Sequence, residues 1–301
     1  MVLMYNLTFQ QIYAFLTAAR FSNLSKAAEY LLVSQPALSR TLGRFEETVG
    51  LKVFSRSNQG VKLLPAGKYL YSEMEPLYDA IETAIRNAQS IAEPAMAQLR
   101  IIQPIAYSVV DDYSAPKEFI KKFEDKYPNV QVEETLCDFQ ELRQRLEYGN
   151  ADIVISQDFA IADITNISSR RVAPYNMFVA VSHLHPLARH DIILPEMLAD
   201  ETLHIVPKTG TPVDKTNALS LYNKMGFSPK SIEFAANFQT LLHTIRHRNG
   251  ISICGRFKNA SDIKYYPIPG ALNHASVVVA WNTRRLTAAA QNFINMIPVE
   301  G

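Results

Sequence analysis

Hydrophobic residues recur every three or four positions in three consecutive segments near the start of the chain, which is the spacing of amphipathic helices. Thr8 begins the first segment with a T-x-x-Q sequence typical of a capping box. Asn23 and Ser34 are placed to cap the second and third helices, and Pro36 is tolerated in a first helical turn. The expected inner faces are formed by Ile12, Phe15, Leu16 and Ala19, by Ala27, Ala28 and Leu31, and by Ala37, Leu38, Leu42 and Phe45. Two such helices joined by a turn of about three residues predict a helix-turn-helix.

Two short alternating runs follow the third segment, at residues 51–54 and 61–64. The turn-forming sequence SNQG lies between them, so the runs predict a β-hairpin. Lys52, Arg56 and Lys62 make this hairpin basic, as expected of a wing that lies against the phosphate backbone of DNA.

The outer face of the third helix carries side chains that can read bases in a DNA groove. In a helix-turn-helix the second helix lies in the major groove, where Gln pairs with adenine, Arg with guanine and Ser with either. The helix N-terminus and Lys26 suit phosphate contacts. A merely solvated polar face is the alternative for this helix alone, and the basic hairpin beside it favours DNA binding.

The run "LSKAAEYLLVSQPALSRTLGRFEETVGLKVFSR" resembles the winged helix-turn-helix of LysR-type transcriptional regulators. The resemblance implies DNA contacts from Ser34, Gln35, Pro36, Ser39 and Arg40 on the recognition helix and from Arg56 on the wing. With Lys26 and Arg44, the expected DNA-binding residues are Lys26, Ser34, Gln35, Pro36, Ser39, Arg40, Arg44 and Arg56. The chain departs from the family pattern at Gly43, inside the recognition helix, and at Leu64, where a Thr usually caps the next helix.

A sustained heptad follows the hairpin and ends before Glu93-Pro94, and it predicts a linker helix over residues 66–95 that joins two copies of the chain. Its apolar positions are Leu70, Met74, Leu77, Ile81, Ala84, Ala88 and Ile91. Packing of the helix on its own domain is the alternative, and Pro76 is expected to kink it. The resemblance implies the same linker helix, often within a tetramer.

Strands and helices alternate in the rest of the chain, which favours a parallel α/β arrangement. The expected strands are residues 99–103, 130–136, 152–156, 176–182, 203–206, 231–235, 251–254 and 276–281. The expected helices are residues 116–127, 138–148, 215–225, 237–248 and 287–297. The chain is therefore expected to combine an all-α winged helix-turn-helix domain (1–65), the linker helix (66–95) and an α/β domain (96–301).

The α/β part resembles the two-lobe effector-binding domain of the same family, which shares its architecture with periplasmic solute-binding proteins. "GNADIVIS" and "HPLA" are similar to family sequences. Lobe I is expected at about residues 96–163 and 268–301, and lobe II at about 164–267. The chain is expected to cross between the lobes near residues 162–166 and 267–270.

Ligands of open α/β sheets bind beyond the carboxyl ends of the strands, and the resemblance implies effector contacts in the same loops. The expected effector-binding residues are Gln103, Pro104, Ile105, Tyr107, Asp138, Phe139, Lys208, Thr209, Asn237 and Phe238. Helix N-termini after Asp138 and Asn237 favour a carboxylate, and Lys208 is a nearby cation. A small, partly apolar organic acid is the expected effector, with an uncharged ligand as the alternative.

Charge is unevenly distributed along this 301-residue chain of formal net charge +1. Seven basic residues against three acidic ones give residues 1–65 a net charge of +4, and the remainder has 23 basic and 26 acidic residues. A basic front segment suits a polyanion such as double-stranded DNA. Two distant cysteines, no apolar run long enough for a membrane span and no leader sequence predict a soluble cytoplasmic protein.

No motif in the sequence supports catalysis, a cofactor or a metal site. His243 and His247 have metal-ligand spacing, but no H-E-x-x-H sequence or third ligand accompanies them. Cys137 and Cys254 are expected to be small buried residues rather than a redox pair. The expected function is therefore a ligand-responsive transcription regulator that is a homodimer or homotetramer. The alternative is a two-lobe small-molecule binder or enzyme whose front domain makes protein contacts.

Overall fold

A computed structural model describes residues 6–57, 60–93, 97–110, 114–210, 212–268 and 275–298 of the chain. By compactness the chain forms two units, Met1–Ile85 and Arg86–Gly301, and their boundary falls inside one long helix. The domain boundaries expected at residues 65 and 95 stay predictions.

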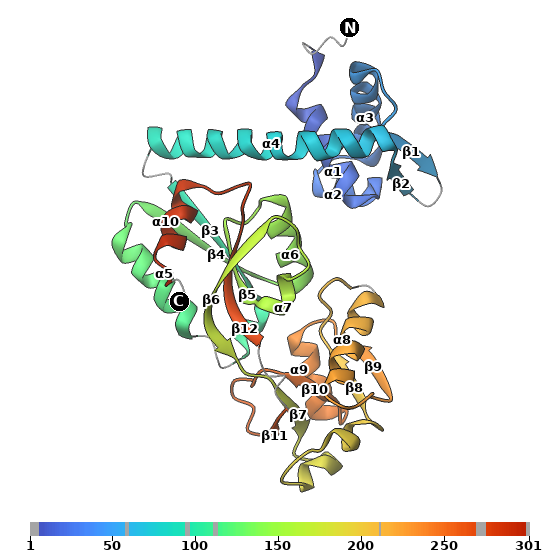
Figure 1. Ribbon diagram of the computed structural model, residues 1–301, viewed down its shortest axis with the longest axis vertical. Helices are drawn as coiled ribbons and strands as arrows, with labels where there is room; N and C mark the ends of the chain where they lie inside the picture. Colours follow the sequence, from blue (N-terminus) through green and yellow to red (C-terminus); the bar gives the residue numbers. More distant parts are fainter. Residues whose placement is uncertain are drawn as a thin grey trace. The chain divides into compact units, whose positions relative to one another are not determined.

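The first unit is a helix-turn-helix followed by a short hairpin and most of the long helix (Figure 1). Its elements are α1 (Phe9–Phe21), α2 (Leu24–Tyr30), α3 (Gln35–Val49), β1 (Phe54–Ser57), β2 (Gly60–Leu63) and α4 (Pro65–Ala92). The three predicted caps are confirmed: side-chain oxygens of Thr8, Asn23 and Ser34 accept backbone N–H groups at the starts of α1, α2 and α3. Each cap satisfies a donor that the helix itself leaves without a partner.

The core of this unit forms where α1 and α3 cross. The rings of Phe15 and Phe45 stack 4.6 Å apart between centroids, and both side chains are fully buried. Leu16, Leu38 and Leu42 surround them. The apolar faces expected from the helical spacing therefore meet as predicted.

The wing differs from its prediction at the first strand, because β1 begins at Phe54 instead of residue 51. The buried carboxylate of Glu46 accepts the backbone N–H groups of Val53 and Phe54 at 3.0 and 3.3 Å. It also binds the ammonium of Lys52 at 2.7 Å. These bonds fix the segment before β1 against α3, so Lys52 belongs to a contact inside the unit.

The start of α4 is fitted closely against this wing although Leu64 cannot cap it through its side chain. The carbonyl of Leu64 accepts the N–H of Lys68, and the N–H of Leu64 donates to the carbonyl of Val53. A β-carbon on Gly67 would lie 2.2 Å from the carbonyl oxygen of Val53, so only glycine fits there. The helix continues through Pro76 and ends at Ala92, as the Glu93-Pro94 signal predicts.

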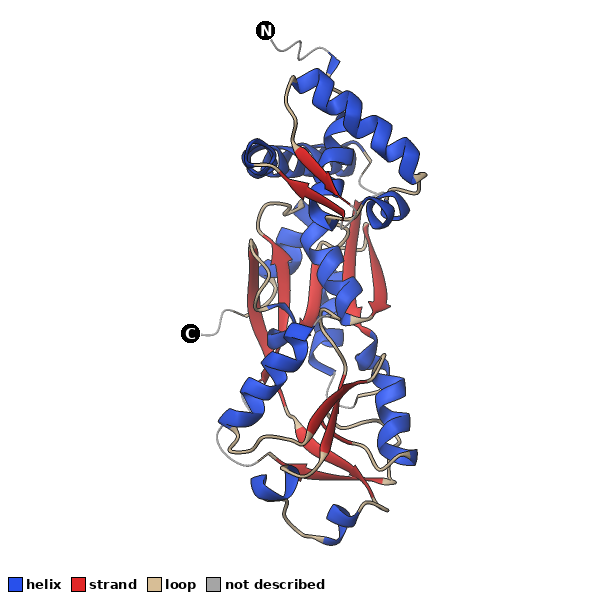
Figure 2. Cartoon of the chain, turned by 90° about the vertical axis from the view of Figure 1, so that its right-hand side faces the viewer, coloured by secondary structure: helices blue, strands red, loops and turns tan. Residues whose placement is uncertain are grey.

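The second unit contains two five-stranded sheets, shown as two groups of strands in Figure 2. The first has the order β4-β3-β5-β12-β6, with β3 (Ala97–Pro104), β4 (Val130–Cys137), β5 (Ile153–Gln157), β6 (Ile167–Tyr175) and β12 (Ala275–Asn282). The second has the order β11-β7-β10-β8-β9, with β7 (Phe178–Ser182), β8 (Thr202–Ile205), β9 (Ser231–Phe234), β10 (Ile251–Cys254) and β11 (Ile263–Pro267). Each sheet is mixed, with antiparallel pairs beside parallel ones, so the expected parallel α/β pairing holds for only part of each sheet.

Helices cover the sheets of this unit. The helices are α5 (Ser114–Lys126), α6 (Phe139–Tyr148), α7 (Asp158–Ile161), α8 (Pro212–Lys224), α9 (Phe238–His247) and α10 (Ala288–Asn295). Figure 1 shows α5 and α10 together on one side of the first sheet, and their Phe123 and Phe293 rings are 5.4 Å apart. Asp138, Asn237 and Thr287 cap α6, α9 and α10 instead of lying within them.

The first crossover between the lobes lies later than predicted. Strand β6 pairs with β12 along its whole length and so belongs to the first sheet. The chain therefore crosses between Tyr175 and Phe178, where β6 ends and β7 begins, and not at residues 162–166. The return crossing lies between β11 and β12, and residues 269–274 of it are outside the described residues.

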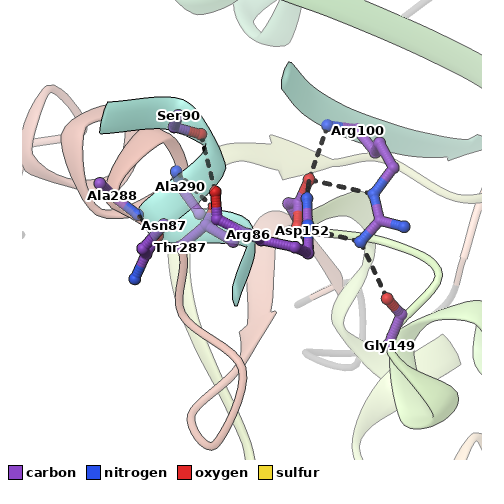
Figure 3. A network of polar contacts seen from close by, with 9 residues as sticks. All are labelled: Arg86, Asn87, Ser90, Arg100, Gly149, Asp152, Thr287, Ala288 and Ala290. Carbon is purple, nitrogen blue, oxygen red and sulfur yellow. Dashed lines mark hydrogen bonds and ion pairs between the residues drawn. The ribbon is translucent and has the colours of Figure 1, made fainter. Parts of the chain in front are cut away.

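The last turns of α4 are bound to the first sheet through a buried carboxylate (Figure 3). Asp152 accepts two hydrogen bonds from the guanidinium of Arg86, at 2.7 and 3.0 Å. It also accepts the backbone N–H and the guanidinium of Arg100. Beside Arg86, the side-chain oxygen of Asn87 accepts the N–H of Ala288 at the start of α10.

Candidate DNA-binding face and effector cavity

The recognition helix α3 presents its polar N-terminal residues to solvent. Ser34 caps the helix by accepting the N–H of Ala37 at 3.3 Å. Gln35, Pro36, Arg40 and Arg44 are exposed, and Ser39 is half-buried. The opposite side of the helix is held by the buried Leu38, Leu42 and Phe45 described above, so the position of this face is fixed by the core.

The remaining predicted DNA contacts lie on neighbouring elements of the same unit. Lys26 is exposed in the first turn of α2. Arg56 lies on β1 with its backbone paired to Val61, and its side chain is outside the part of the chain that the structure describes. Lys62 is exposed on β2, opposite Ser55.

The cations of the first unit divide into two groups that the sequence alone does not distinguish. Arg20 is buried against Glu75 and Asp79 of α4, and Lys52 binds Glu46. Within the described residues, no ion pair involves Lys26, Arg40, Arg44 or Lys62. The charge left for a polyanion is therefore concentrated on α2, α3 and the wing.

The second unit contains a cavity of about 360 Å³ between its two sheets. Residues at the end of β5 and from β8, β10, α8 and α9 line it. Its walls are mostly apolar, with aromatic rings from both lobes: Phe139, Phe159, Tyr175, Tyr222 and Phe238. A concave, apolar site with a few polar groups is the usual form of a small-molecule site.

Each charged residue of the cavity wall makes hydrogen bonds inside the protein. Lys208 donates from Nζ to the carbonyl of Phe159 at 2.9 Å, and burial lowers the pKa of its ammonium although Asp163 and Asp214 act in the opposite direction. Asp158 Oδ1 accepts the N–H of the next residue, Phe159, and Oδ2 accepts the N–H of Ser276. Asp214 is 4% exposed, and one of its carboxylate oxygens accepts hydrogen bonds from the N–H groups of Thr209 and Gly210.

The predicted effector contacts separate into three groups. Phe139, Lys208 and Phe238 line the cavity. A second recess has no room for a water molecule and is lined by these two phenylalanines together with Pro104, Ile105, Asp138 and Asn237. Gln103, Tyr107 and Thr209 line neither space.

Internal contacts account for this last group. The amide of Gln103 donates to Glu134, the carbonyl of Tyr107 accepts Lys258, and Thr209 donates to Asp214. Whether any of the ten residues contacts an effector stays a prediction.

Sequence reasoning missed several residues of the cavity wall: Gln157, Asp158, Tyr175, Met177, Asp214, Ser252 and Cys254. Gln157 and Asp158 lie at the carboxyl end of β5, so the strand-end rule used for the other loops could have found them. Tyr175 and Met177 were missed because β6 and the true crossover were not recognised.

Both cysteines are buried and free, and the thiol of Cys254 lies in the cavity wall. Burial raises the pKa of each thiol to about 12, so both stay protonated at neutral pH. His243 and His247 lie with ring centroids 4.7 Å apart, and no group of three metal-binding side chains occurs among the described residues. None of the described helices combines the length and hydrophobicity needed to cross a bilayer.

Residues 9–68 match the family described as "Bacterial regulatory helix-turn-helix protein, lysR family", and residues 117–298 match the "LysR substrate binding domain". The chain belongs to the LysR family. It is a LysR-type DNA-binding transcriptional regulator with an effector-binding domain, and the winged helix-turn-helix and two-lobe architecture expected from the sequence are confirmed.

Similar LysR-family proteins match the chain over most of its length. It is 25% identical over 289 residues to the uncharacterized regulator YybE of Bacillus subtilis (strain 168), covering 94% of this chain and 96% of the relative. It is 25% identical over 228 residues to AlsR of the same organism, covering 76% and 74%. These relatives are regulators, as expected, and not enzymes.

Solved LysR-family structures share the fold at low identity. CbnR in complex with its target DNA superposes with a TM-score of 0.51 at 17% identity, covering 97% of this chain and 98% of that chain. Full-length BenM gives a TM-score of 0.53 at 19% identity, covering 97% and 95%.

Proposed function

We propose that the chain regulates transcription as a dimer or higher homo-oligomer that binds two DNA half-sites and responds to a small molecule held between the lobes of its second unit. The observation that carries the proposal is the combination of an exposed, basic recognition face with a cavity walled by both lobes. The similar protein CbnR was solved at full length in complex with its target DNA, which supports the DNA-binding half.

The recognition face supports base reading by Gln35, Ser39 and Arg40. Their helix is held from behind by the core, which leaves its outer face open to a major groove. Lys26 and the Ser34 cap lie at the N-terminal ends of α2 and α3, and such helix ends suit a phosphate. Arg44 and Lys62, both exposed, extend the basic surface along α3 and onto the wing, and the sequence adds Arg56 on β1.

The linker helix supports assembly of two copies. Leu70 and Met74 of the heptad pack on the core of the first unit. The later heptad residues Leu77, Ile81, Ala84, Ala88 and Ile91 are exposed and form one stripe of α4. Leu77 is 64% and Ile91 is 81% exposed, so the stripe offers apolar surface to a second copy.

A ligand between the lobes would act by favouring one arrangement of the two sheets. The ligand can shift the equilibrium between two arrangements only by the difference between its affinities for them. Among the described residues, the crossing between the lobes near Tyr175–Phe178 is the segment where such a change would occur.

The oligomer hypothesis is tested with Ile81→Asp, which places a charge in the exposed stripe of α4. We expect the variant to have a lower mass in light scattering and to lose cooperative binding to an operator recovered by genomic mapping. Gln89→Asp is the matched control, because Gln89 is exposed on the same helix outside the stripe. An unchanged mass and unchanged cooperativity for Ile81→Asp would refute assembly through α4.

A further inference from the structure

The cavity between the lobes has one unusual feature, a buried carboxylate oxygen without a partner. Asp214 Oδ2 accepts the N–H of Thr209 at 2.8 Å, the hydroxyl of Thr209 at 3.1 Å and the N–H of Gly210 at 2.9 Å. Within the described residues, Oδ1 is buried and makes no hydrogen bond. A buried acceptor without a donor is costly, and Asp214 belongs to the wall of the cavity.

Lys208 is less suited to receive a carboxylate than its charge suggests. Its Nζ already donates to the carbonyl of Phe159 and lies 5.7 Å from the centre of that ring. Asp163 and Asp214 are near enough to raise the pKa of this ammonium, against the larger lowering by burial. The ammonium is therefore partly satisfied within the protein.

The balance of charge also disfavours an anion. Among the described residues that line the cavity, Asp158 and Asp214 are acidic and Lys208 is basic, which leaves one net negative charge. A like charge brought into a low-dielectric site is strongly repelled.

The two caps of the helices whose N-termini favoured a carboxylate in the sequence do not line the cavity. Asp138 and Asn237, the caps of α6 and α9, line the second recess and not the main cavity. That recess has no room for a water molecule. An anionic group therefore has no room beside these two caps, and Phe139 and Phe238, the first residues of the two helices, contribute aromatic rings to the main cavity.

We infer that the effector is an apolar, ring-sized molecule whose polar end is an amine or a hydroxyl that donates to Asp214, and not an organic acid. The aromatic walls take the apolar part, and Asp214 orients the donor. This inference rests on the proposed function, because it names the ligand class of the cavity between the lobes.

Three probes with one skeleton test the ligand class on the full chain: 2-phenylethylamine, 2-phenylethanol and phenylacetate. In titration calorimetry we expect the amine to bind best, the alcohol next, and phenylacetate about tenfold or more weaker than the amine. Asp214→Asn should weaken binding of the amine by about tenfold, because the substitution removes the negative charge. It keeps an oxygen that accepts the Thr209 and Gly210 hydrogen bonds. Lys208→Met removes the cation of the cavity wall, so it should weaken phenylacetate binding further.

Ala218→Phe separates the ligand class from the cavity itself. Ala218 lies in the cavity wall, so a ring at this position should fill the space and abolish binding of all three probes. Undiminished binding to Ala218→Phe would place the site elsewhere and refute the proposed function of the cavity.

Other outcomes overturn only the ligand class. These are tighter binding of phenylacetate that is lost in Lys208→Met, or amine binding that is unaffected by a folded Asp214→Asn protein. Absence of binding by both donor probes would also overturn it. Far-ultraviolet circular dichroism of each variant establishes that it is folded.

Discussion

Two glycines of the first unit lie in opposite environments. Gly43 is in the middle of α3, and a β-carbon built there meets nothing within 4 Å. Gly67 is in the first turns of α4, where a β-carbon would lie 2.2 Å from the carbonyl oxygen of Val53. The first glycine therefore only weakens its helix, while the second allows α4 to approach the wing.

Gly43→Ala is expected to stabilise the first unit by about 0.5–1 kcal/mol, because alanine has the higher helix propensity and the space for its methyl group is open. Gly67→Ala is the contrasting variant and is expected to lower the melting temperature. Thermal unfolding followed by circular dichroism measures both. A Gly67→Ala protein as stable as the wild type would show that α4 does not need its close contact with Val53.

At the level of elements, the sequence predicted the helices and strands in which local signals, such as caps, coincide with a repeat of apolar residues. Thr8, Asn23 and Ser34 each precede an apolar helical repeat, and all three cap helices. Strand β6 was missed because its sequence, ISSRRVAPY, is interrupted by SSRR and has no long apolar run. It lies at the edge of its sheet and pairs with one strand, so it needs no continuous apolar run.

The end of α4 shows a second limit of sequence reasoning, because its partners are distant in the chain. Arg86 and Asp152 are 66 residues apart, and no local pattern connects them. The heptad indicated an interface with another copy along the whole helix. Arg86 and Asn87 lie between the heptad positions, and their side chains contact the first sheet and α10.

Arg86→Ala is expected to destabilise the second unit by about 1.5–3 kcal/mol, the usual worth of hydrogen bonds to a charged group. Asp152 is buried, and Arg100 alone would remain to satisfy it. Urea unfolding followed by fluorescence reports on this unit specifically, because the single tryptophan, Trp281, lies on β12.

Lys122→Ala is the matched control for Arg86→Ala. Lys122 forms an exposed ion pair with Glu118 on α5, and such pairs contribute little. Equal unfolding midpoints for the two variants would contradict the role of Arg86 in holding the last turns of α4.

At the level of the whole molecule, the two functional parts differ in how far the sequence defines them. The proposed DNA-binding face lies on one continuous segment, so its residues could be proposed from the sequence alone. The cavity is assembled from strands and loops of both lobes, and its composition depends on where the chain crosses between them. Asp214 illustrates the difference, because its importance comes from an oxygen left without a partner in the folded protein.

The central claim, that α3 reads DNA bases, is tested most directly by measuring operator affinity over a range of salt concentrations. The operator fragment comes from genomic mapping, and the proteins are the wild type, Arg40→Ala and Lys122→Ala. We expect Arg40→Ala to lose about 1–3 kcal/mol of binding free energy and to discriminate less at one base pair. Lys122→Ala should bind as the wild type does. Equal affinity and equal base preference of Arg40→Ala and the wild type would contradict the account.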